Sequence, residues 1–171
     1  MLAFHNDYHA GAHPKVLKAL VSTNGAAQDG YGADEYSESA RARIRHAIED
    51  EQAEVFFVTG GTQTNQLVID TMLSAWEGVI SADTGHVSVH EAGAIEFCGH
   101  KVLTVPSENG LMDPNDVRSL ARNFYDDPNH EHMVFPGMVY LSYPSEYGTL
   151  YSADQLHEIR AICDEFNMCL F

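Results

Sequence analysis

The chain has 171 residues, of which 44% are hydrophobic and 10% aromatic, and this is enough for one folded domain with a sizeable core. Its formal net charge of −16 argues against nucleic acid or an anionic membrane as a partner, because both attract basic surfaces. No apolar run is long enough to span a membrane, and residues 1–7 have neither the basic start nor the apolar core of a secretory leader. We therefore expect a cytoplasmic protein.

The three cysteines, Cys98, Cys163 and Cys169, do not indicate a disulfide framework or a zinc site. Their number is odd and no pair has CxxC spacing, whereas disulfide-rich domains and Cys-rich zinc sites have paired, regularly spaced cysteines. We expect all three to serve as small apolar residues.

The N-terminal part of the chain predicts an arm followed by two helices. The arm covers residues 1–13, and a short amphipathic helix begins at Pro14 and ends near Asn24. A loop with several glycines over 28–34 leads into a second helix over 37–48.

Histidines in the arm leave a metal site open as an alternative. His5, His9 and His13 stand four residues apart and could share one helical face as ligands. Gly11 and Pro14 disfavour a continuous helix through them.

The stretch over residues 55–69 predicts a strand, a glycine turn and a helix in succession. The run at 55–58 is apolar, β-branched and aromatic, which predicts a buried strand that ends before Gly60 and Gly61. These glycines let the backbone approach a bound group, and the N–H groups of the next helical turn favour an anion such as a phosphate. Because neither GxGxxG nor GxxxxGK[ST] is present, a smaller phosphate ester is the candidate; simple packing of helix on strand is the alternative.

Polar residues also follow the strand predicted at 78–82. The segment 83–86 and a short helix starting at His86 lie just beyond the carboxyl end of that strand, where open α/β sheets bind their ligands. His86 and His90 could instead form a metal pair near Glu91, although the HExxH order is absent. A surface histidine without a role is a third interpretation.

The rest of the chain alternates strands and helices. Strands are predicted at 101–105, 138–142 and 168–171, and helices at 115–124, after Asp113 and Pro114, and at 153–166, with a capping box of Ser152 and Gln155. This alternation predicts an α/β fold, in which a mostly parallel sheet has helices on both faces and no linker divides the chain. Because the last predicted strand is apolar, we expect further polypeptide or a partner to cover it.

Several short motifs together resemble the threonine aldolase and β-eliminating lyase family. They are YG at 31–32, FVTGGTQTN at 57–65, ADTGH at 82–86, EAG at 91–93 and GHKV at 99–102. Their order and spacing are similar to those of these fold-type I enzymes, which use pyridoxal 5′-phosphate (PLP). The resemblance implies that residues 1–171 are the N-terminal portion of such an enzyme, with the arm followed by part of the large domain of a PLP-dependent transferase fold.

The resemblance assigns a cofactor site to residues of the glycine turn and the two helices that follow: Gly60, Gly61, Thr62, Asn65, His86 and Glu91. Gly61 and Thr62 match residues that hold the cofactor phosphate, in agreement with the helix N-terminus argument. His86 matches a histidine that stacks on the pyridine ring. It is the catalytic candidate for handling the proton of the substrate's β-hydroxyl, because imidazole is flat and titrates near neutrality. Glu91 matches a glutamate near the substituents of the ring.

Three further residues match substrate positions of the family. Asn6 falls where many members have a serine that touches the substrate carboxylate, and Tyr31 matches a tyrosine that reaches a neighbouring subunit's site. Ser145 falls where aldolases of the bacterial low-specificity type have a histidine, and this difference weakens threonine as the particular substrate.

Two family residues are missing from the chain. Members continue beyond the last predicted strand into an aspartate that pairs with the pyridinium nitrogen and a lysine that forms the Schiff base. Lys15 and Lys18 lie on a predicted surface helix and Lys101 opens a strand that runs away from the site. The resemblance therefore implies a complementing C-terminal segment or chain, and the isolated chain should be catalytically poor or inactive.

Three functions stay open at this point. The first is a PLP-dependent carbon–carbon lyase that cleaves a β-hydroxy-α-amino acid substrate to glycine and an aldehyde, acting as a homo-oligomer. The second is β-elimination on an amino acid with a leaving group, for which the same cofactor site serves. The third is a truncated binding or assembly module without catalysis; a histidine-based metal protein is a weaker alternative.

Overall fold

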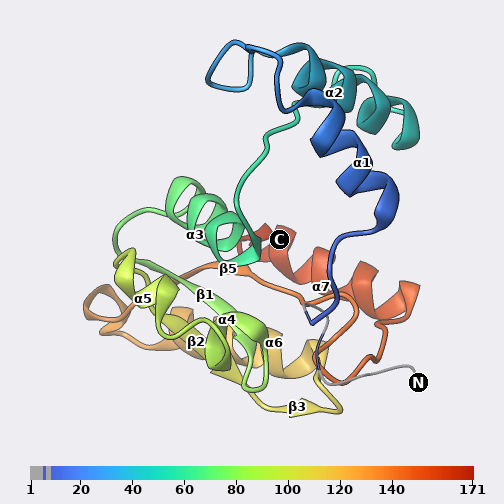
Figure 1. Cartoon of the computed structure of the whole chain (residues 1–171). Coiled ribbons are helices and arrows are strands. Elements are labelled where there is room, and N and C mark those ends of the chain that lie inside the picture. Colours follow the sequence, from blue (N-terminus) through green and yellow to red (C-terminus); the bar gives the residue numbers. More distant parts are fainter. Residues whose placement is uncertain (1–5, 7–8) are drawn as a thin grey trace. The chain divides into compact units, whose positions relative to one another are not determined.

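The computed structural model describes residue 6 and residues 9–171 and divides the chain into two compact units (Figure 1). The first unit is Met1–Phe57 and the second is Val58–Phe171. Helices make up the regular structure of the first unit, whereas the second unit contains the sheet. That the whole chain is one portion of a single large domain stays a prediction.

The first unit contains the two helices that the sequence predicts. They are α1 (Pro14–Thr23) and α2 (Glu35–Ala47). The Asp34 carboxylate caps α2 by accepting a hydrogen bond from the Ser37 N–H at 2.8 Å, and hydrogen bonds from Ser37 lower the pKa of Asp34. His9 and His13 precede α1, so no single helix carries the spaced histidines of the arm, and His5 lies outside the described residues.

Arginine side chains connect α2 to the loops of the first unit. Arg41 donates to the Gly32 carbonyl at 2.7 Å and to the Val55 carbonyl at 3.1 Å, and Arg45 donates to the Ala53 carbonyl at 2.8 Å. Among the described residues of this unit none is buried. Side-chain hydrogen bonds to the backbone therefore connect α2 to the loops, and the described residues of this unit form no buried core.

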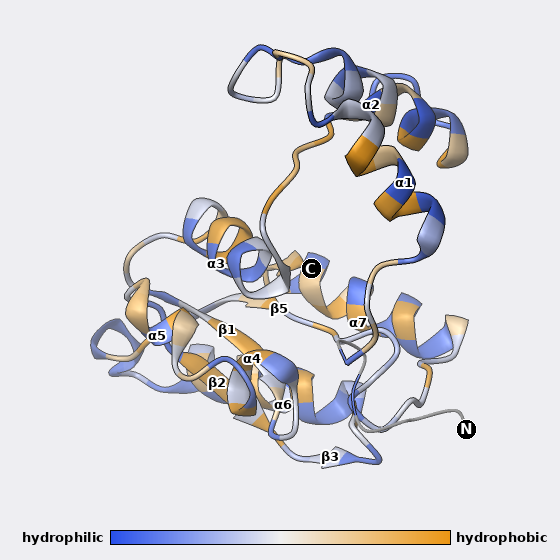
Figure 2. Ribbon diagram, viewed as in Figure 1, coloured by the Kyte–Doolittle hydropathy of each residue, from blue (hydrophilic) through white to orange (hydrophobic). Residues whose placement is uncertain are grey.

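The prediction of a buried strand at 55–58 is wrong. These residues have no regular secondary structure, and Phe56, Phe57 and Val58 are 77%, 50% and 41% exposed. Figure 2 shows an apolar stretch leading into α3 (Gly61–Met72). An apolar extended segment forms a strand only beside a partner that offers backbone hydrogen bonds, and no strand in the described part of the chain pairs with it.

The second unit is built on a four-stranded parallel sheet with the order β2-β1-β5-β6. Its strands are β1 (Glu77–Ala82), β2 (Val102–Val105), β5 (Phe135–Val139) and β6 (Cys169–Leu170). The predicted strands at 78–82, 101–105 and 168–171 are confirmed. The strand predicted at 138–142 starts earlier, at Phe135, and its regular part ends at Val139.

Helices cover both faces of this sheet, as the sequence predicts. One core packs Ile80 of β1 and Val139 of β5 against α6 (Pro114–Asp126) and α7 (Ala153–Glu165). The other packs Val79 of β1 against α3, α4 (His86–Val89) and α5 (Ala94–Phe97). Successive residues of a strand point to opposite faces, which separates the two cores.

The smaller elements complete the second unit. The capping box of Ser152 and Gln155 opens α7 and the Asp113 carboxylate caps α6, both as predicted. An antiparallel pair and a short helix were not predicted from the sequence: β3 (Ser107–Glu108), β4 (Leu111–Met112) and η1 (His130–His132). Among the described residues, no helix has both the length and the apolar character needed to cross a bilayer.

Burial predicts different stability effects for two residues of α3. Ile69 is 0% exposed, whereas Leu67 is 50% exposed. We expect Ile69→Ala to lower the free energy of unfolding by about 2–5 kcal/mol, because it leaves a cavity, and Leu67→Ala by less than about 1 kcal/mol. Urea unfolding followed by circular dichroism measures both, and equal losses would contradict the assignment of the core.

Burial also predicts that Cys163 is an unreactive thiol. Cys163 belongs to α7, its side chain lies in the core, and burial raises the pKa of its thiol to about 11. Because the thiolate is the reactive form, the raised pKa alone lowers the reactive fraction at pH 8 by roughly 100-fold, and reactivity returns only as the pH rises toward the raised pKa. A thiol reagent should therefore modify the partly exposed Cys98 long before it modifies Cys163. Cys98→Ser and Cys163→Ser variants assign the two labelling rates. Comparable rates for the two cysteines would show that the prediction is wrong.

Candidate functional site

The parallel pairing of β1 and β5 brings two polar segments to one edge of the sheet. Ile80 is in register with Val139, and the Tyr140 N–H donates to the Ile80 carbonyl at 2.8 Å. Parallel strands have their carboxyl ends at the same edge. The segment that follows β1 carries His86, and the loop that follows β5 carries Glu146.

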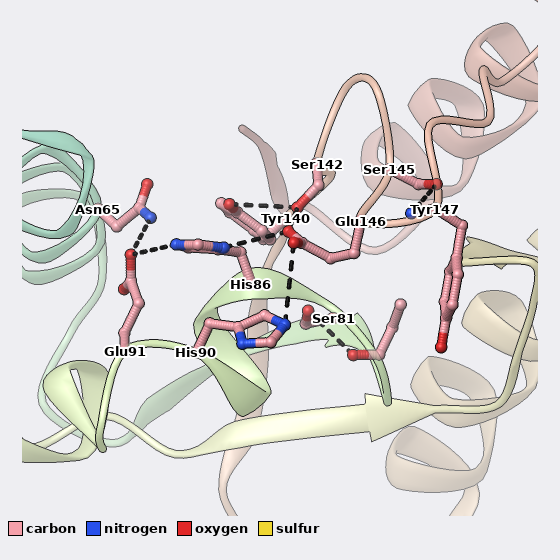
Figure 3. Close-up of polar contacts among 11 residues, drawn as sticks. Asn65, Ser81, His86, His90, Glu91, Tyr140, Ser142, Ser145, Glu146 and Tyr147 are labelled. Carbon is pink, nitrogen blue, oxygen red and sulfur yellow. Dashed lines mark hydrogen bonds and ion pairs between the residues drawn. The ribbon is translucent and has the colours of Figure 1, made fainter. Parts of the chain in front are cut away.

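His86 lies between two carboxylates at this edge (Figure 3). Its Nδ1 atom is 3.2 Å from Glu146 Oε1, and its Nε2 atom is 3.6 Å from Glu91 Oε1. The His86 side chain is 41% exposed, so one part of the ring faces solvent while both nitrogens face acidic groups.

Glu91 is the buried member of the cluster. Its side chain is 0% exposed. The Oε1 atom accepts a hydrogen bond from Asn65 Nδ2 at 2.8 Å, whereas Oε2 is buried with no hydrogen-bond partner among the described residues. A buried carboxylate oxygen without a donor is costly, so it marks a place where a polar group of a ligand would gain a hydrogen bond.

Asn65 connects this cluster to the start of α3. It is itself 8% exposed and lies about one helical turn beyond Gly61, the first residue of α3. The contact from Asn65 to Glu91 therefore places the glycine turn and the His86 segment around one site.

The N-terminus of α3 is open to solvent and has no acidic residue in its first turn. Its N-cap residue, Gly60, has no side chain to bond the first N–H groups. A Cβ atom at Gly60 or Gly61 would meet no atom within 4 Å. The exposed N–H groups of this turn, with Thr62 beside them, can therefore bind an anion.

Tyr140 forms a buried part of the site. Tyr140 is 8% exposed, and its phenol oxygen lies 3.5 Å from the Ser142 hydroxyl oxygen. Burial raises the pKa of Tyr140, and the charges of Glu91 and Glu146 raise it further. Tyr140 therefore stays a neutral phenol at neutral pH.

Glu146 is a site residue that the sequence analysis missed. Its Oε2 atom lies 3.9 Å from His90 Nε2, and its Oε1 atom accepts a hydrogen bond from the Ser142 hydroxyl at 3.3 Å. The rule that polar residues gather beyond the carboxyl ends of parallel strands could have found it, because it follows β5.

Ser145 lies in the same loop, but its hydroxyl makes hydrogen bonds within that loop and not to His86 (Figure 3). It accepts hydrogen bonds from the Tyr147 and Thr149 N–H groups, both at 3.2 Å, and contacts the Thr149 hydroxyl. Ser145 is 6% exposed. Its predicted contact with substrate stays a prediction.

Asn6 and Tyr31 belong to the first unit. Asn6 is half-buried, and Tyr31 is fully exposed with a positive φ of 61°. Their predicted substrate roles also stay predictions, as do the cofactor roles of the residues in the second unit.

His86 and His90, the pair considered as metal ligands, have ring centroids 5.5 Å apart and both approach Glu146. Within residue 6 and residues 9–171, no group of three His, Cys, Asp or Glu side chains is arranged to hold a metal ion.

Comparison with known proteins assigns the family. The model of the β-eliminating lyase family matches residues 5–171. The chain belongs to the β-eliminating lyase family. This membership, together with the parallel sheet and the helices on its two faces, confirms the predicted fold class and the predicted resemblance.

This family member is similar to threonine aldolases along nearly its whole length. It is 32% identical over 169 residues to the low specificity L-threonine aldolase of Pseudomonas sp. (strain NCIMB 10558), covering 98% of this chain and 47% of that protein. The threonine aldolase structure from Leishmania major is 40% identical with a TM-score of 0.89, covering 97% of this chain and 47% of that one. The lyase-family chain spans about half the length of the relatives it matches.

A more distant structure supports the fold alone. The PLP-bound C-S lyase from Staphylococcus hominis is 11% identical to this lyase-family chain with a TM-score of 0.59, covering 91% of this chain and 39% of that one.

The contact between Asn65 and Glu91 generates a stability prediction. Asn65→Leu removes the donor to a buried carboxylate, and we expect it to lower the free energy of unfolding by about 1–3 kcal/mol. Glu91→Gln keeps an oxygen acceptor for Asn65 and removes the buried charge, so it should cost less than Asn65→Leu. Chemical unfolding of both variants measures the difference, and a more damaging Glu91→Gln would contradict the proposed pairing.

Proposed function

We propose that this chain forms the phosphate and ring-binding part of a PLP-dependent carbon–carbon lyase of the L-threonine aldolase type. The observation that carries the proposal is the chain of contacts from Asn65 through Glu91 to His86, which joins the α3 N-terminus to the polar edge of the sheet. Family membership and the threonine aldolase relatives support the reaction class. The substrate would be a β-hydroxy-α-amino acid, cleaved to glycine and an aldehyde.

The residues present fit the cofactor. Gly60, Gly61 and Thr62 would hold its phosphate ester, because the glycine positions leave open space that a side chain would fill. Glu91 would hold a polar substituent of the ring, because its Oε2 atom is buried without a donor among the described residues. His86 would lie flat against the ring.

The proposed chemistry divides between the cofactor and His86. PLP, when bound, supplies an electron-withdrawing ring that accepts the electron pair of the Cα–Cβ bond. His86 would take the proton of the β-hydroxyl, directly or through a water that it positions, so that the C–O bond becomes the carbonyl of the departing aldehyde. Glu91 and Glu146 would stabilise the imidazolium that this step forms.

Two residues would come from other polypeptide. One is the lysine that forms the Schiff base with the cofactor, and the other is the aspartate that pairs with the ring nitrogen of the cofactor. Lys101 is exposed at the start of β2, on the edge opposite to the carboxyl ends of the strands. A complementing segment or chain would also cover the apolar residues of the segment 55–58 and Phe171. The completed protein would be a homo-oligomer, and a cytoplasmic location stays a prediction.

β-Elimination is the second candidate function, because the same cofactor site would serve an amino acid with a leaving group. By the family resemblance Ser145 stands where bacterial low-specificity aldolases carry a histidine, which weakens threonine as the particular substrate and leaves both reaction types to be tested. A non-catalytic binding module would have the phosphate site without the lysine in any chain of the particle.

Product analysis separates these functions in the protein as it is isolated, with any polypeptide that accompanies it. With PLP, we expect L-threonine to give glycine and acetaldehyde, and His86→Asn to lower the rate by about 100-fold or more. L-Serine giving pyruvate and ammonia faster than L-threonine gives glycine would favour β-elimination. A lone 171-residue chain by intact mass, without absorbance from a bound cofactor, would favour the binding module.

Pyridoxine 5′-phosphate tests the phosphate site without a Schiff base, because it has no aldehyde. We expect Gly61→Ala to weaken its binding by about 10-fold, since the new methyl group fills the space proposed for the phosphate. Folding should be unaffected, because a Cβ atom at Gly61 meets no atom within 4 Å.

Gly25→Ala is the matched control for that measurement, since Gly25 also has open space around its Cβ position. Isothermal titration calorimetry gives the affinities of the three proteins. Equal affinities for wild type and Gly61→Ala, or equal affinities for pyridoxine with and without its phosphate, would refute the phosphate site.

A further inference from the structure

The carboxylate of Glu146 contacts both histidines of the α4 segment. It lies on the loop after β5, and its Oε1 and Oε2 atoms approach His86 Nδ1 at 3.2 Å and His90 Nε2 at 3.9 Å. The Ser142 hydroxyl donates to Oε1 at 3.3 Å. Glu146 Oε1 therefore makes two contacts within hydrogen-bond distance, to His86 and to Ser142, and the side chain is only 26% exposed.

The two nitrogens of His86 are not equivalent. Nδ1 is within hydrogen-bond distance of Glu146, whereas Nε2 makes the longer approach of 3.6 Å to Glu91 Oε1. That Glu91 oxygen already accepts a hydrogen bond from Asn65 at 2.8 Å. A carboxylate only accepts hydrogen bonds, so the shorter contact requires a proton on Nδ1.

We propose that Glu146 is a positioning residue that holds the proton of neutral His86 on Nδ1 and fixes the plane of the ring. Nε2 is then the nitrogen with the free lone pair, and it is the atom that accepts the β-hydroxyl proton. After that transfer both nitrogens carry protons, and each faces a carboxylate. The catalytic part of this inference rests on the proposed function, whereas the proton position on the free protein does not.

The Ser142 hydroxyl supports the orientation of the Glu146 carboxylate. It donates to the same oxygen, Oε1, that contacts His86 Nδ1, so that a rotation of the carboxylate would lose both contacts, and His90 Nε2 lies 3.9 Å from Oε2. Loss of Glu146 would leave His86 free to turn about its side-chain bonds, because its remaining polar neighbour is Glu91 at the longer distance.

Nitrogen NMR of the histidine rings measures the proposal directly on protein in the assembly in which it is isolated. Two-bond and three-bond correlations to the ring hydrogens distinguish Nδ1–H from Nε2–H, and a His86→Gln variant assigns the His86 signals. Spectra are recorded without cofactor at alkaline pH, where an imidazole is ordinarily neutral. Glu146→Ala removes the acceptor, Glu146→Gln keeps an oxygen acceptor of the same size, and Glu158→Ala on the exposed face of α7 is the control.

We expect the Nδ1–H form of His86 in wild type, in Glu146→Gln and in Glu158→Ala. In Glu146→Ala the ratio of Nδ1–H to Nε2–H should fall by about 10-fold, because the hydrogen bond to a charged acceptor is lost. A wild-type proton on Nε2, a ring that stays doubly protonated, or a ratio that Glu146→Ala leaves unchanged would each overturn the proposal.

The two proposals fail in different measurements. If His86 carries its proton on Nδ1 but pyridoxine 5′-phosphate does not bind, the proposed function is wrong and the role of Glu146 in orienting His86 stands. If the ligand binds but the proton lies on Nε2, Glu146 is not the positioning residue.

Discussion

The parallel pairing of β1 with β5 is the constraint on which the rest of the structure depends. Because the two strands run in the same direction and are in register at Ile80 and Val139, their following segments leave the sheet at one edge. His86 and Glu146 are 60 positions apart in the sequence, yet their side chains meet there at 3.2 Å. Packing of helices on the two faces of the sheet holds this register, so the cores and the site depend on the same strands.

Local geometry, rather than net charge, would explain how so acidic a chain holds the proposed anionic cofactor. The formal charge is −16, but the first turn of α3 contains no acidic residue and its N-terminus is open. Backbone N–H groups at a helix start attract an anion at short range, whereas distant surface charges are screened by salt. The acidic groups of the site, Glu91 and Glu146, instead face His86.

The sequence predicted most elements because each has a local cause. Asp113 and Ser152 are N-caps whose side chains accept hydrogen bonds from N–H groups two or three residues further along the chain. The apolar runs of β1 and β2 form strands because they pair with each other. The segment 55–58 has the same apolar pattern but no partner strand in the described residues, and a strand depends on a partner that its own sequence does not encode. The contact of Glu146 with His86 likewise depends on a second strand, although the position of Glu146 after β5 marked it as a residue of the polar sheet edge.

The most direct test of the central claim is a crystal structure of the protein with PLP, together with any polypeptide that completes it. We expect phosphate oxygens within hydrogen-bond distance of the Gly61 and Thr62 N–H groups, the pyridine ring against His86, and Glu146 still bonded to His86 Nδ1. A phosphate bound elsewhere, with the N-terminus of α3 facing protein or His86 turned away from the ring, would contradict it.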